Sequence, residues 1–251
     1  MSDTMRHVAF EACFNFRDLG GYESRDGRRV RWGMLFRSDT LHRLTEADGE
    51  IFHDLGLRTV IDLRSSTELQ GYGRLNVTGG EFAWHNVPMS DNLILAPRGS
   101  DEELPEPLPP GEGYFQTAQR FGGSLTLVFR LLCEGQALPA VFHCTSGKDR
   151  TGIIAALVLD ILGIPDEVIA SDYALTEEAQ ERSTTWIEAN EPDFAAFLAE
   201  IPYERRAATP EKILGFLDRI RAQYGSVEVY LASLGVGSEQ LDVLRDRLLG
   251  G

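Results

Sequence analysis

Cys144 and Arg150 are separated by five residues in the run VFHCTSGKDRTG, residues 141–152. An apolar stretch that ends at Phe142 leads into the cysteine, and a short loop with one glycine, Gly147, leads to the arginine. When such a loop opens a helix, its backbone N–H groups point inward and the positive end of the helix dipole adds to them. The run therefore predicts an anion-sized cradle with a cysteine at its start.

The chemistry that suits this cradle is nucleophilic attack on phosphorus. The planar guanidinium of Arg150 can bind two oxygens of a phosphate group. The same positive field favours the thiolate of Cys144, which is the reactive form of cysteine. We therefore predict that Cys144 is the nucleophile and that Arg150 is the phosphate clamp. The residues predicted to bind the substrate around them are Thr145, Ser146, Gly147, Lys148 and Thr151.

Three side chains of this run each allow two interpretations. His143 precedes the cysteine, and because alternate side chains of a strand point to opposite faces, we expect it to brace the loop rather than to act as a base. Thr151 could donate a hydrogen bond to the sulfur of Cys144 or cap the helix. Lys148 could add charge for substrates with more than one phosphate, or it could be solvated.

The run resembles the signature loop of the cysteine-dependent phosphatases, which is Cys-x5-Arg followed by Ser or Thr. Its longer form, His-Cys-x-x-Gly-Lys-Asp-Arg-Thr-Gly, is similar to that of the atypical tyrosine phosphatases of bacteria and fungi. Three more segments resemble motifs of that family and occur in the family's order, so the resemblance spans residues 15 to 152. They are NFRDLGGY at 15–22, LFRS at 35–38, and VIDLRS at 60–65 with Glu68.

The resemblance implies an α/β fold with a central, mainly parallel sheet flanked by helices, and an active-site loop between a strand and a buried helix. It implies a hydrolase that acts on phosphotyrosine, sometimes on phosphoserine or phosphothreonine, and often on phosphoinositides, through a phosphocysteine intermediate. Phosphotyrosine in proteins is the first expectation, and phosphoinositide hydrolysis is the alternative. Inorganic phosphate and other oxyanions should bind as ligands. No metal or other cofactor is expected, because the amides and the arginine supply the positive charge.

Hydrolysis also needs a carboxylic acid that protonates the leaving group and then activates water. The resemblance favours Asp149, since members of the family carry Asp before the Arg. The alternative is Asp91, which follows a predicted strand and the residues Val87, Pro88 and Met89. The sequence leaves both assignments open.

Other charged residues are expected to support the site. Asp18, Asp62 and Asp172 are further candidate acids, or carboxylates that organise loops. Arg17 and Arg64 are candidates for making the cleft positive. A local basic site is needed because the chain has a formal net charge of −15, which would otherwise repel a phosphate substrate.

The net charge argues against nucleic-acid binding and against adhesion to anionic membranes, since the protein's own field repels both. The first residues lack a basic region followed by an apolar run, and no apolar stretch reaches the roughly 20 residues that cross a bilayer. Three cysteines, Cys13, Cys133 and Cys144, suggest no disulfide framework and suit a reducing compartment. We therefore expect a cytoplasmic protein without stable membrane insertion.

Periodicity and turn signals predict the elements that must position these residues. Strands are predicted over 29–36 with an interruption at Gly33, over 57–63, over 82–87 and over 140–142. Helices are predicted over 45–55, 113–133 and 151–162, as one or two helices over 165–190, and from Thr209–Pro210 and Ser238 onward. Strands separated by helices indicate an α/β fold with its site at the carboxyl ends of parallel strands.

The chain is long enough for one sizeable core, so we expect a single phosphatase domain over residues 1–251. Residues 172–208 read as helices without a strand, and they either cover the active site as a lid or form an ordinary packed layer. Two other functions remain as alternatives. One is a phosphate-binding module without catalysis, and the other is a sulfurtransferase, which also carries its cysteine in an anion-binding loop.

Overall fold

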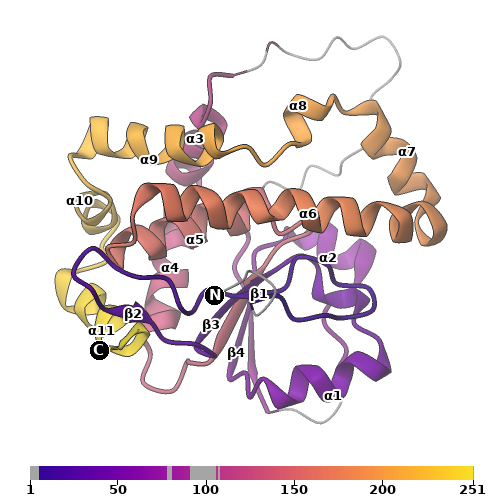
Figure 1. Ribbon diagram of the computed structural model, residues 1–251, viewed down its shortest axis with the longest axis horizontal. Helices are drawn as coiled ribbons and strands as arrows, with labels where there is room; N and C mark the ends of the chain where they lie inside the picture. Colours follow the sequence, from indigo (N-terminus) through magenta and orange to yellow (C-terminus); the bar gives the residue numbers. More distant parts are fainter. Residues whose placement is uncertain (1–5, 78–80, 91–105, 107, 251) are drawn as a thin grey trace.

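The computed structural model describes residues 6–77, 81–90, 106 and 108–250. Within them the chain forms a five-stranded sheet in the order β1-β3-β6-β4-β5, with helices around it (Figure 1). Neighbouring strands are parallel except for β1, which pairs antiparallel with β3. The predicted, mainly parallel α/β fold is therefore confirmed. The strands are β1 (Arg17–Asp18), β3 (Leu35–Ser38), β6 (Ala140–His143), β4 (Thr59–Asp62) and β5 (Ala83–Asn86).

Helices make up most of the rest of the described chain. In the view of Figure 1, α6 crosses the middle of the molecule, with the sheet below it and with α7, α8 and α9 above it. None of the described helices is both long and apolar enough to span a membrane. The helices are α1 (Glu46–Asp54), α2 (Ser66–Tyr72), α3 (Glu112–Arg120), α4 (Gly122–Cys133), α5 (Asp149–Ile161), α6 (Asp166–Asn190), α7 (Pro192–Glu200), α8 (Tyr203–Arg206), α9 (Pro210–Tyr224), α10 (Val227–Ser233) and α11 (Ser238–Leu248). A short antiparallel pair joins β2 (Arg29–Val30) to β7 (Leu249–Gly250).

The two faces of the sheet are buried against different elements, because side chains alternate along each strand. On β6, Val141 belongs to the cluster that contains Phe16 and Phe52 of α1. Phe142 belongs to the larger cluster on the other face, which contains the apolar residues of α5. Most residues of α5 are buried, as its nearly continuous apolar sequence predicts. The loop between β6 and α5 is thus anchored in the core at both ends.

The carboxyl ends of three parallel strands meet at one edge of the sheet. Ser38 at the end of β3 and Asp62 at the end of β4 both pair with His143 at the end of β6. The chain segments that leave these strands therefore start side by side, and one of them is the loop that begins at Cys144. In open α/β sheets this edge is where ligands bind.

Several predicted boundaries are confirmed. Thr45 and Asp48 form a capping box at the start of α1. Thr209 is the N-cap of α9, and Pro210 is its first residue. The strands predicted over 57–63 and 82–87 are observed as the shorter β4 and β5.

Two helices differ from the sequence prediction. The helix predicted over 113–133 is two helices, because the backbone leaves the helical region at Phe121 (φ −105°, ψ 31°), just before a pair of glycines. Helix α5 begins at Asp149 rather than at Thr151. Helical backbone thus starts within the polar loop, before the apolar run that periodicity detects. Both Asp149 and Arg150 consequently lie in the first turn of α5.

We expect Gly215→Ala to destabilise the protein, because α9 has no room for a methyl group where it passes the start of α3. A Cβ at Gly215 would lie 2.4 Å from the carbonyl oxygen of Pro110. The free energy of unfolding, measured in urea, should fall by about 2 kcal/mol, as at other overpacked sites. The matched control is Gly123→Ala in α4, where a Cβ meets nothing within 4 Å and alanine favours the helix. Equal stability of the two variants would contradict this close packing.

Candidate active site

Residues 144–148 connect β6 to α5. Cys144 follows β6 directly, and it is only 2 % exposed. Gly147 has a φ of +65°, and a Cβ there would lie 2.7 Å from both the carbonyl oxygen of Ser38 and the amide nitrogen of Asp39. Glycine is required here, because other residues tolerate neither this backbone angle nor so close an approach.

The carbonyls of the loop are turned outward by donors from the N-terminal part of the chain. The carbonyl oxygens of residues 145, 146 and 147 each accept a hydrogen bond from outside the loop. In that order, the donors are the backbone N–H of Thr40 (3.1 Å), the side-chain amide of Asn15 (3.0 Å) and the guanidinium of Arg37 (2.8 Å). Because the C=O and N–H of one trans peptide group point in opposite directions, the N–H groups of residues 146–148 face the inside of the loop.

These inward N–H groups are available to a ligand. Among the described residues, none accepts a hydrogen bond from the backbone N–H of residues 145–148. Unpaired N–H groups in a folded protein usually have a partner in water or a ligand, and several of them at a helix start attract anions. The loop is therefore built as a cradle for an anion, with Cys144 at its first position.

Arg37 is held in turn by a buried carboxylate, Asp172 of α6. Arg37 Nη1 lies 2.6 Å from Asp172 Oδ2, and Arg17 Nε lies 3.1 Å from Oδ1. The hydroxyl of Tyr22 donates to the same carboxylate at 3.0 Å. Burial would raise the pKa of Asp172, but Arg17 and Arg37 outweigh it and hold the pKa well below its ordinary value. Arg17 is thus a core residue neutralised by Asp172, and it does not make the cleft positive as the sequence suggested.

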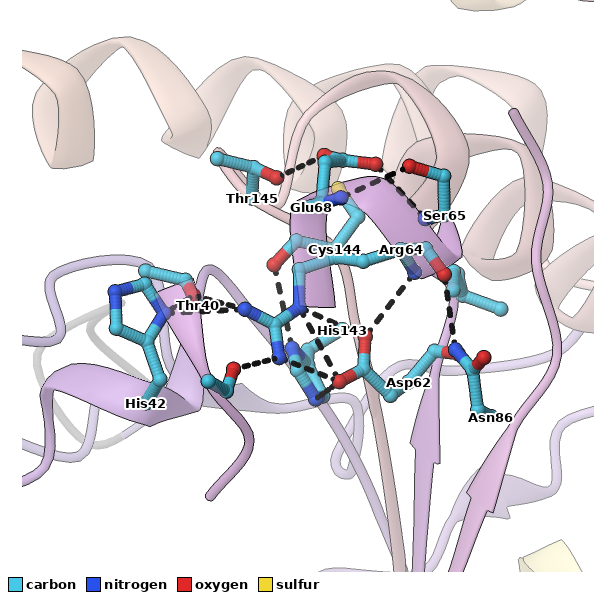
Figure 2. Close-up of polar contacts among 12 residues, drawn as sticks. Thr40, His42, Asp62, Arg64, Ser65, Glu68, Asn86, His143, Cys144 and Thr145 are labelled. Carbon is cyan, nitrogen blue, oxygen red and sulfur yellow. Dashed lines mark hydrogen bonds and ion pairs between the residues drawn. The ribbon is translucent and has the colours of Figure 1, made fainter. Parts of the chain in front are cut away.

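A second buried ion pair joins Arg64 to Asp62, below Cys144 and Thr145 in the view of Figure 2. Arg64 Nη2 is 2.6 Å from Asp62 Oδ2, and both side chains are fully buried. Arg64 therefore does not face the cleft either, because its charge is used within the core.

His143 lies between that ion pair and the loop (Figure 2). Its Nε2 is 3.5 Å from Asp62 Oδ2, and its Nδ1 is 3.2 Å from the carbonyl oxygen of Cys144. Burial lowers the pKa of His143, against the nearby carboxylate of Asp62, which raises it. When Nδ1 carries a proton, it donates to the carbonyl of Cys144. This geometry places His143 where it can brace the first peptide of the loop.

Another candidate acid from the sequence, Asp18, does not line the cavity. The carboxylate of Asp18 accepts hydrogen bonds from the N–H groups of Gly20 (2.7 Å) and Gly33 (2.6 Å), and burial raises its pKa. Asp18 thus organises the turns around β1. Asp91 lies outside the described residues.

Arg150 is paired with Glu68 in the first turn of α2. Its Nη1 and Nη2 lie 2.6 and 2.8 Å from the two carboxylate oxygens, and the hydroxyl of Thr145 donates to the same carboxylate at 2.5 Å. Burial would raise the pKa of Glu68, but these partners hold it at about 2, so Glu68 is ionised at neutral pH. Burial also opposes the charge of Arg150, yet the sulfur of Cys144 and the carboxylate of Glu68 raise its pKa above the ordinary value.

The pairing leaves one edge of Arg150 open. Glu68 takes the end of the guanidinium formed by Nη1 and Nη2. The Nε–H group donates to no acceptor within the described part of the chain. On the edge formed by Nε and Nη2, the one contact besides Glu68 among the described residues is a long one, from Nη2 to the hydroxyl of Thr145 at 3.3 Å. Because a guanidinium carries five N–H donors in a rigid plane, a phosphate that displaces this contact can bind Nε and Nη2 side by side through two of its oxygens.

The side chains of Lys148 and Thr151 donate hydrogen bonds to backbone carbonyls that the sequence did not suggest as partners. Lys148 is 6 % exposed, and its ammonium donates to the carbonyls of residues 205 and 206 at 3.2 and 2.7 Å. It is therefore neither solvated nor free for a second phosphate. The hydroxyl of Thr151 lies 3.5 Å from the carbonyl oxygen of Ser38, and between these described residues it makes no hydrogen bond to the sulfur of Cys144.

Asp149 faces the cavity above the loop, and its side chain is 51 % exposed. The hydroxyl of Tyr114 donates to Oδ1 at 2.5 Å, and the ammonium of Lys148 lies 3.5 Å from the same oxygen. Desolvation would raise the pKa of Asp149, but Lys148, Tyr114 and Arg150 outweigh it and lower the pKa. Asp149 is consequently a carboxylate in this state.

The cavity has a volume of about 340 Å³, a polar floor and an apolar roof. The floor is the loop itself with Glu68 beside it. In the described part of the chain, no group of three or more His, Cys, Asp or Glu residues could hold a metal ion. The apolar part of the roof comes from the end of α6, from α7 and from the turn after it, and consists of Ile187, Phe194, Phe197, Leu198 and Ile201. The polar side chains beside it, from α6 and α8, are Gln180, Ser183, Thr184, Arg205 and Arg206.

Three residues that hold the loop were not predicted to belong to the site, namely Glu68, Asn15 and Arg37. For Glu68 a local signal existed, because Ser65-x-x-Glu68 is a capping box that starts α2 and places the carboxylate in its first turn. Asn15 and Arg37 lie in the segments NFRDLGGY and LFRS that resemble the family, but no local pattern shows that they contact the loop. Their partners in the loop lie 131 and 110 residues away in the sequence.

The comparisons of the sequence with a family model and with relatives agree. Residues 8–250 match the family model described as the tyrosine phosphatase family. The chain is 31 % identical to a tyrosine-protein phosphatase of Nostoc commune, over 84 % of this chain and 73 % of that protein. It is 30 % identical to the triple specificity protein phosphatase PtpB of Mycobacterium tuberculosis, over 95 % of this chain and 97 % of that protein. The catalytic core of the PP-IP phosphatase SIW14 of S. cerevisiae has a TM-score of 0.38 at 16 % identity, with coverages of 67 % and 78 %.

We expect Asp172→Asn to be strongly destabilising, because it leaves Arg17 and Arg37 buried without a countercharge. Removing one partner of a buried ion pair costs about 3–5 kcal/mol, which unfolding in urea would measure. The matched control is Asp26→Asn, whose partner Arg28 is exposed like Asp26 itself. Exposed pairs contribute little, so the control should keep the parent's stability. A stable Asp172→Asn variant would contradict the proposed bracing of the loop.

Proposed function

Since this chain belongs to the tyrosine phosphatase family, we propose that it removes phosphate from phosphotyrosine in proteins, and also from phosphoserine or phosphothreonine, through a phosphocysteine intermediate. The observation that carries this proposal is the arrangement of the loop. Its N–H groups at residues 146–148 face inward, Cys144 stands at its start, and Arg150 is open along one edge. These donors suit the oxygens around a phosphorus atom that the sulfur attacks.

In the first step the sulfur of Cys144 attacks phosphorus, so an S–P bond forms while the P–O bond to the leaving group breaks. The inward N–H groups and the open edge of Arg150 stabilise the charge on the other three oxygens. Asp149 gives a proton to the departing oxygen, and a neutral phenol or alcohol leaves. Because the pKa of Asp149 is lowered in the free protein, its protonated form depends on the phosphate dianion, whose charge favours a neutral carboxyl group nearby.

In the second step water attacks the phosphocysteine. An O–P bond forms and the S–P bond breaks, which releases inorganic phosphate and returns the thiolate of Cys144. Asp149, now ionised, accepts the proton from the water. Thr151 contributes by tying the start of α5 to β3 through the carbonyl of Ser38, rather than by stabilising the sulfur.

Phosphotyrosine is the preferred substrate in this proposal because the cavity combines a polar floor with an apolar roof. An aromatic ring that carries the phosphate would pack among Ile187, Phe194 and Phe197. A phosphoserine side chain has no apolar body to place there. Phosphoinositide hydrolysis is the weaker alternative, since the ammonium of Lys148 is held by backbone carbonyls and gives no free charge for a second phosphate.

We also propose that residues 1–251 form a single phosphatase domain, in which the later part of residues 172–208 acts as a lid. Helices α7 and α8 contain no buried residue, although side chains of α7 roof the cavity. The segment is held at its ends, where Arg43 pairs with Glu191 at 2.5 Å and Lys148 binds the carbonyls of residues 205 and 206. Because elements with few buried contacts open at low free energy, α7 and α8 are the parts that would open. Helix α6 packs as an ordinary layer of the fold.

The decisive test is metal-free hydrolysis of para-nitrophenyl phosphate by the protein and by Cys144→Ser. We expect the parent to turn over in the presence of a chelator and the variant to fall to the background rate, because serine is a much weaker nucleophile without a general base. Cys133→Ser is the matched control and should keep the parent's rate, since Cys133 lies in α4, where its thiol donates to the carbonyl of Gln240.

Other outcomes of this test favour the alternatives. A parent that binds phosphate without turnover would favour the non-catalytic module. A parent that converts thiosulfate and cyanide to thiocyanate would favour the sulfurtransferase. A Cys144→Ser variant with the parent's rate would rule out Cys144 as the nucleophile.

We further expect Glu68→Gln to lower kcat/KM for para-nitrophenyl phosphate by roughly tenfold, the value of one charge-assisted hydrogen bond. The amide keeps the shape of the carboxylate, but it no longer orients Arg150 through two charged contacts. Ser90→Ala is the control: it removes one contact to Nη1 at 3.0 Å and one neutral hydrogen bond to Glu68 at 3.2 Å, but it leaves both charged contacts between Glu68 and Arg150, so it should reduce activity less. Equal effects of the two changes would show that Glu68 does not orient Arg150.

A further inference from the structure

Two tyrosines from different helices meet at the carboxylate of Asp149. The hydroxyl of Tyr114, from α3, lies 2.5 Å from Asp149 Oδ1 and 2.5 Å from the hydroxyl of Tyr173, from α6. The two rings are edge-to-face, with centroids 6.2 Å apart. Neither tyrosine lies in the cysteine loop or in one of the sequence motifs that resemble the family. The fold alone brings them to Asp149.

The direction of these hydrogen bonds follows from counting protons. An ionised carboxylate only accepts, so the single proton of Tyr114 goes to Asp149. The oxygen of Tyr114 is then free to accept the proton of Tyr173. Hydrogen bonds in such a chain strengthen one another, and those that end on a charge are the strongest. Tyr173 therefore increases the hold of Tyr114 on the carboxylate.

Tyr173 is itself fixed in place. It is 1 % exposed, and a Cβ at Gly152 of α5 would lie 2.9 Å from its ring. It also follows Asp172, whose carboxylate is bound by Arg17 and Arg37. The chain of hydroxyls thus starts from a rigid part of the core and ends at the cavity.

We propose that Tyr114 is a positioning residue for the general acid: its hydroxyl, supported by Tyr173, holds the carboxylate of Asp149 over the loop and favours its ionised form. This inference rests on the proposed function, in which Asp149 protonates the leaving group and then accepts a proton from water. The second of these steps needs the carboxylate, and the hydrogen bond from Tyr114 stabilises that form.

Several charged groups besides Tyr114 act on Asp149. Lys148 and Arg150 flank it in the chain, and Lys212 faces it from α9; all three lower the pKa of Asp149, against desolvation, which would raise it. Glu177 of α6 acts on Lys212 and Tyr173 rather than on Asp149 directly. These three cations remain when the hydroxyl of Tyr114 is removed. The effect of that hydroxyl on the pKa of Asp149 can therefore be measured separately.

The test is the pH dependence of kcat/KM for Tyr114→Phe. The substitution keeps the ring, which also packs edge-to-face on Phe216, and removes the hydrogen bond to the carboxylate. The pKa of Asp149 should then rise. Because the reaction needs protonated Asp149, the limb where activity falls at high pH should move upward by about one pH unit, the size of one charge-assisted hydrogen bond.

Two further variants make the result specific. Tyr173→Phe should move the same limb in the same direction by less, since it acts only through Tyr114. In the background of Asp149→Asn, which has no titrating carboxyl group at this position, Tyr114→Phe should leave the pH profile unchanged. Phenyl phosphate, with a poor leaving group, should lose more activity in Asp149→Asn than para-nitrophenyl phosphate does.

The outcomes separate this inference from the proposed function. A parent without Cys144-dependent turnover overturns the proposed function. An active parent whose high-pH limb is the same in Tyr114→Phe overturns the inference alone. A shift that persists in the Asp149→Asn background also overturns it, because Tyr114 would then act on another group.

Discussion

Asp172 binds two buried guanidinium groups, and the shape of the loop depends on this interaction. Arg37 reaches from Asp172 to the carbonyl oxygen of Gly147, which turns the following N–H into the cradle. The cluster of Arg17, Arg37 and Asp172 has one more cation than anion and lies in a low-dielectric interior, where charges act strongly. A phosphate dianion on the other side of the loop would complement it. The cluster that braces the loop thus also places one net positive charge behind it.

A chain with a net charge of −15 can bind an anion in this way because most of the attraction comes from oriented dipoles rather than from free side-chain charge. Arg64 is neutralised by Asp62, and Arg150 is paired with Glu68 while keeping one edge open. The inward N–H groups carry no net charge, and they act only over a short distance. The net negative charge of the chain is therefore compatible with a local site for phosphate.

Helix α6 connects the separate parts of the site. Asp172 braces the loop, the adjacent Tyr173 supports the hydroxyl that binds Asp149, and Ile187 near the other end of the helix lies in the apolar roof. Because these residues share one rigid element, the shape of the cradle, the ionisation of the acid and the fit of an aromatic substrate are coupled. A displacement of α6 would change all three together.

The sequence by itself determined the local parts of this protein. The cysteine loop with its one glycine, the buried helix after it, the short apolar strands and the capped helix starts all depend on residues close together in the chain, where periodicity and spacing carry the information. Tertiary structure decided which charges meet. Arg17 and Lys148 were expected to offer free charge at the cleft, but both are bound by partners that are 155 and 58 residues away in the sequence. Coulomb and hydrogen-bond energies depend on distances of a few ångströms, and a sequence specifies the charges without those distances.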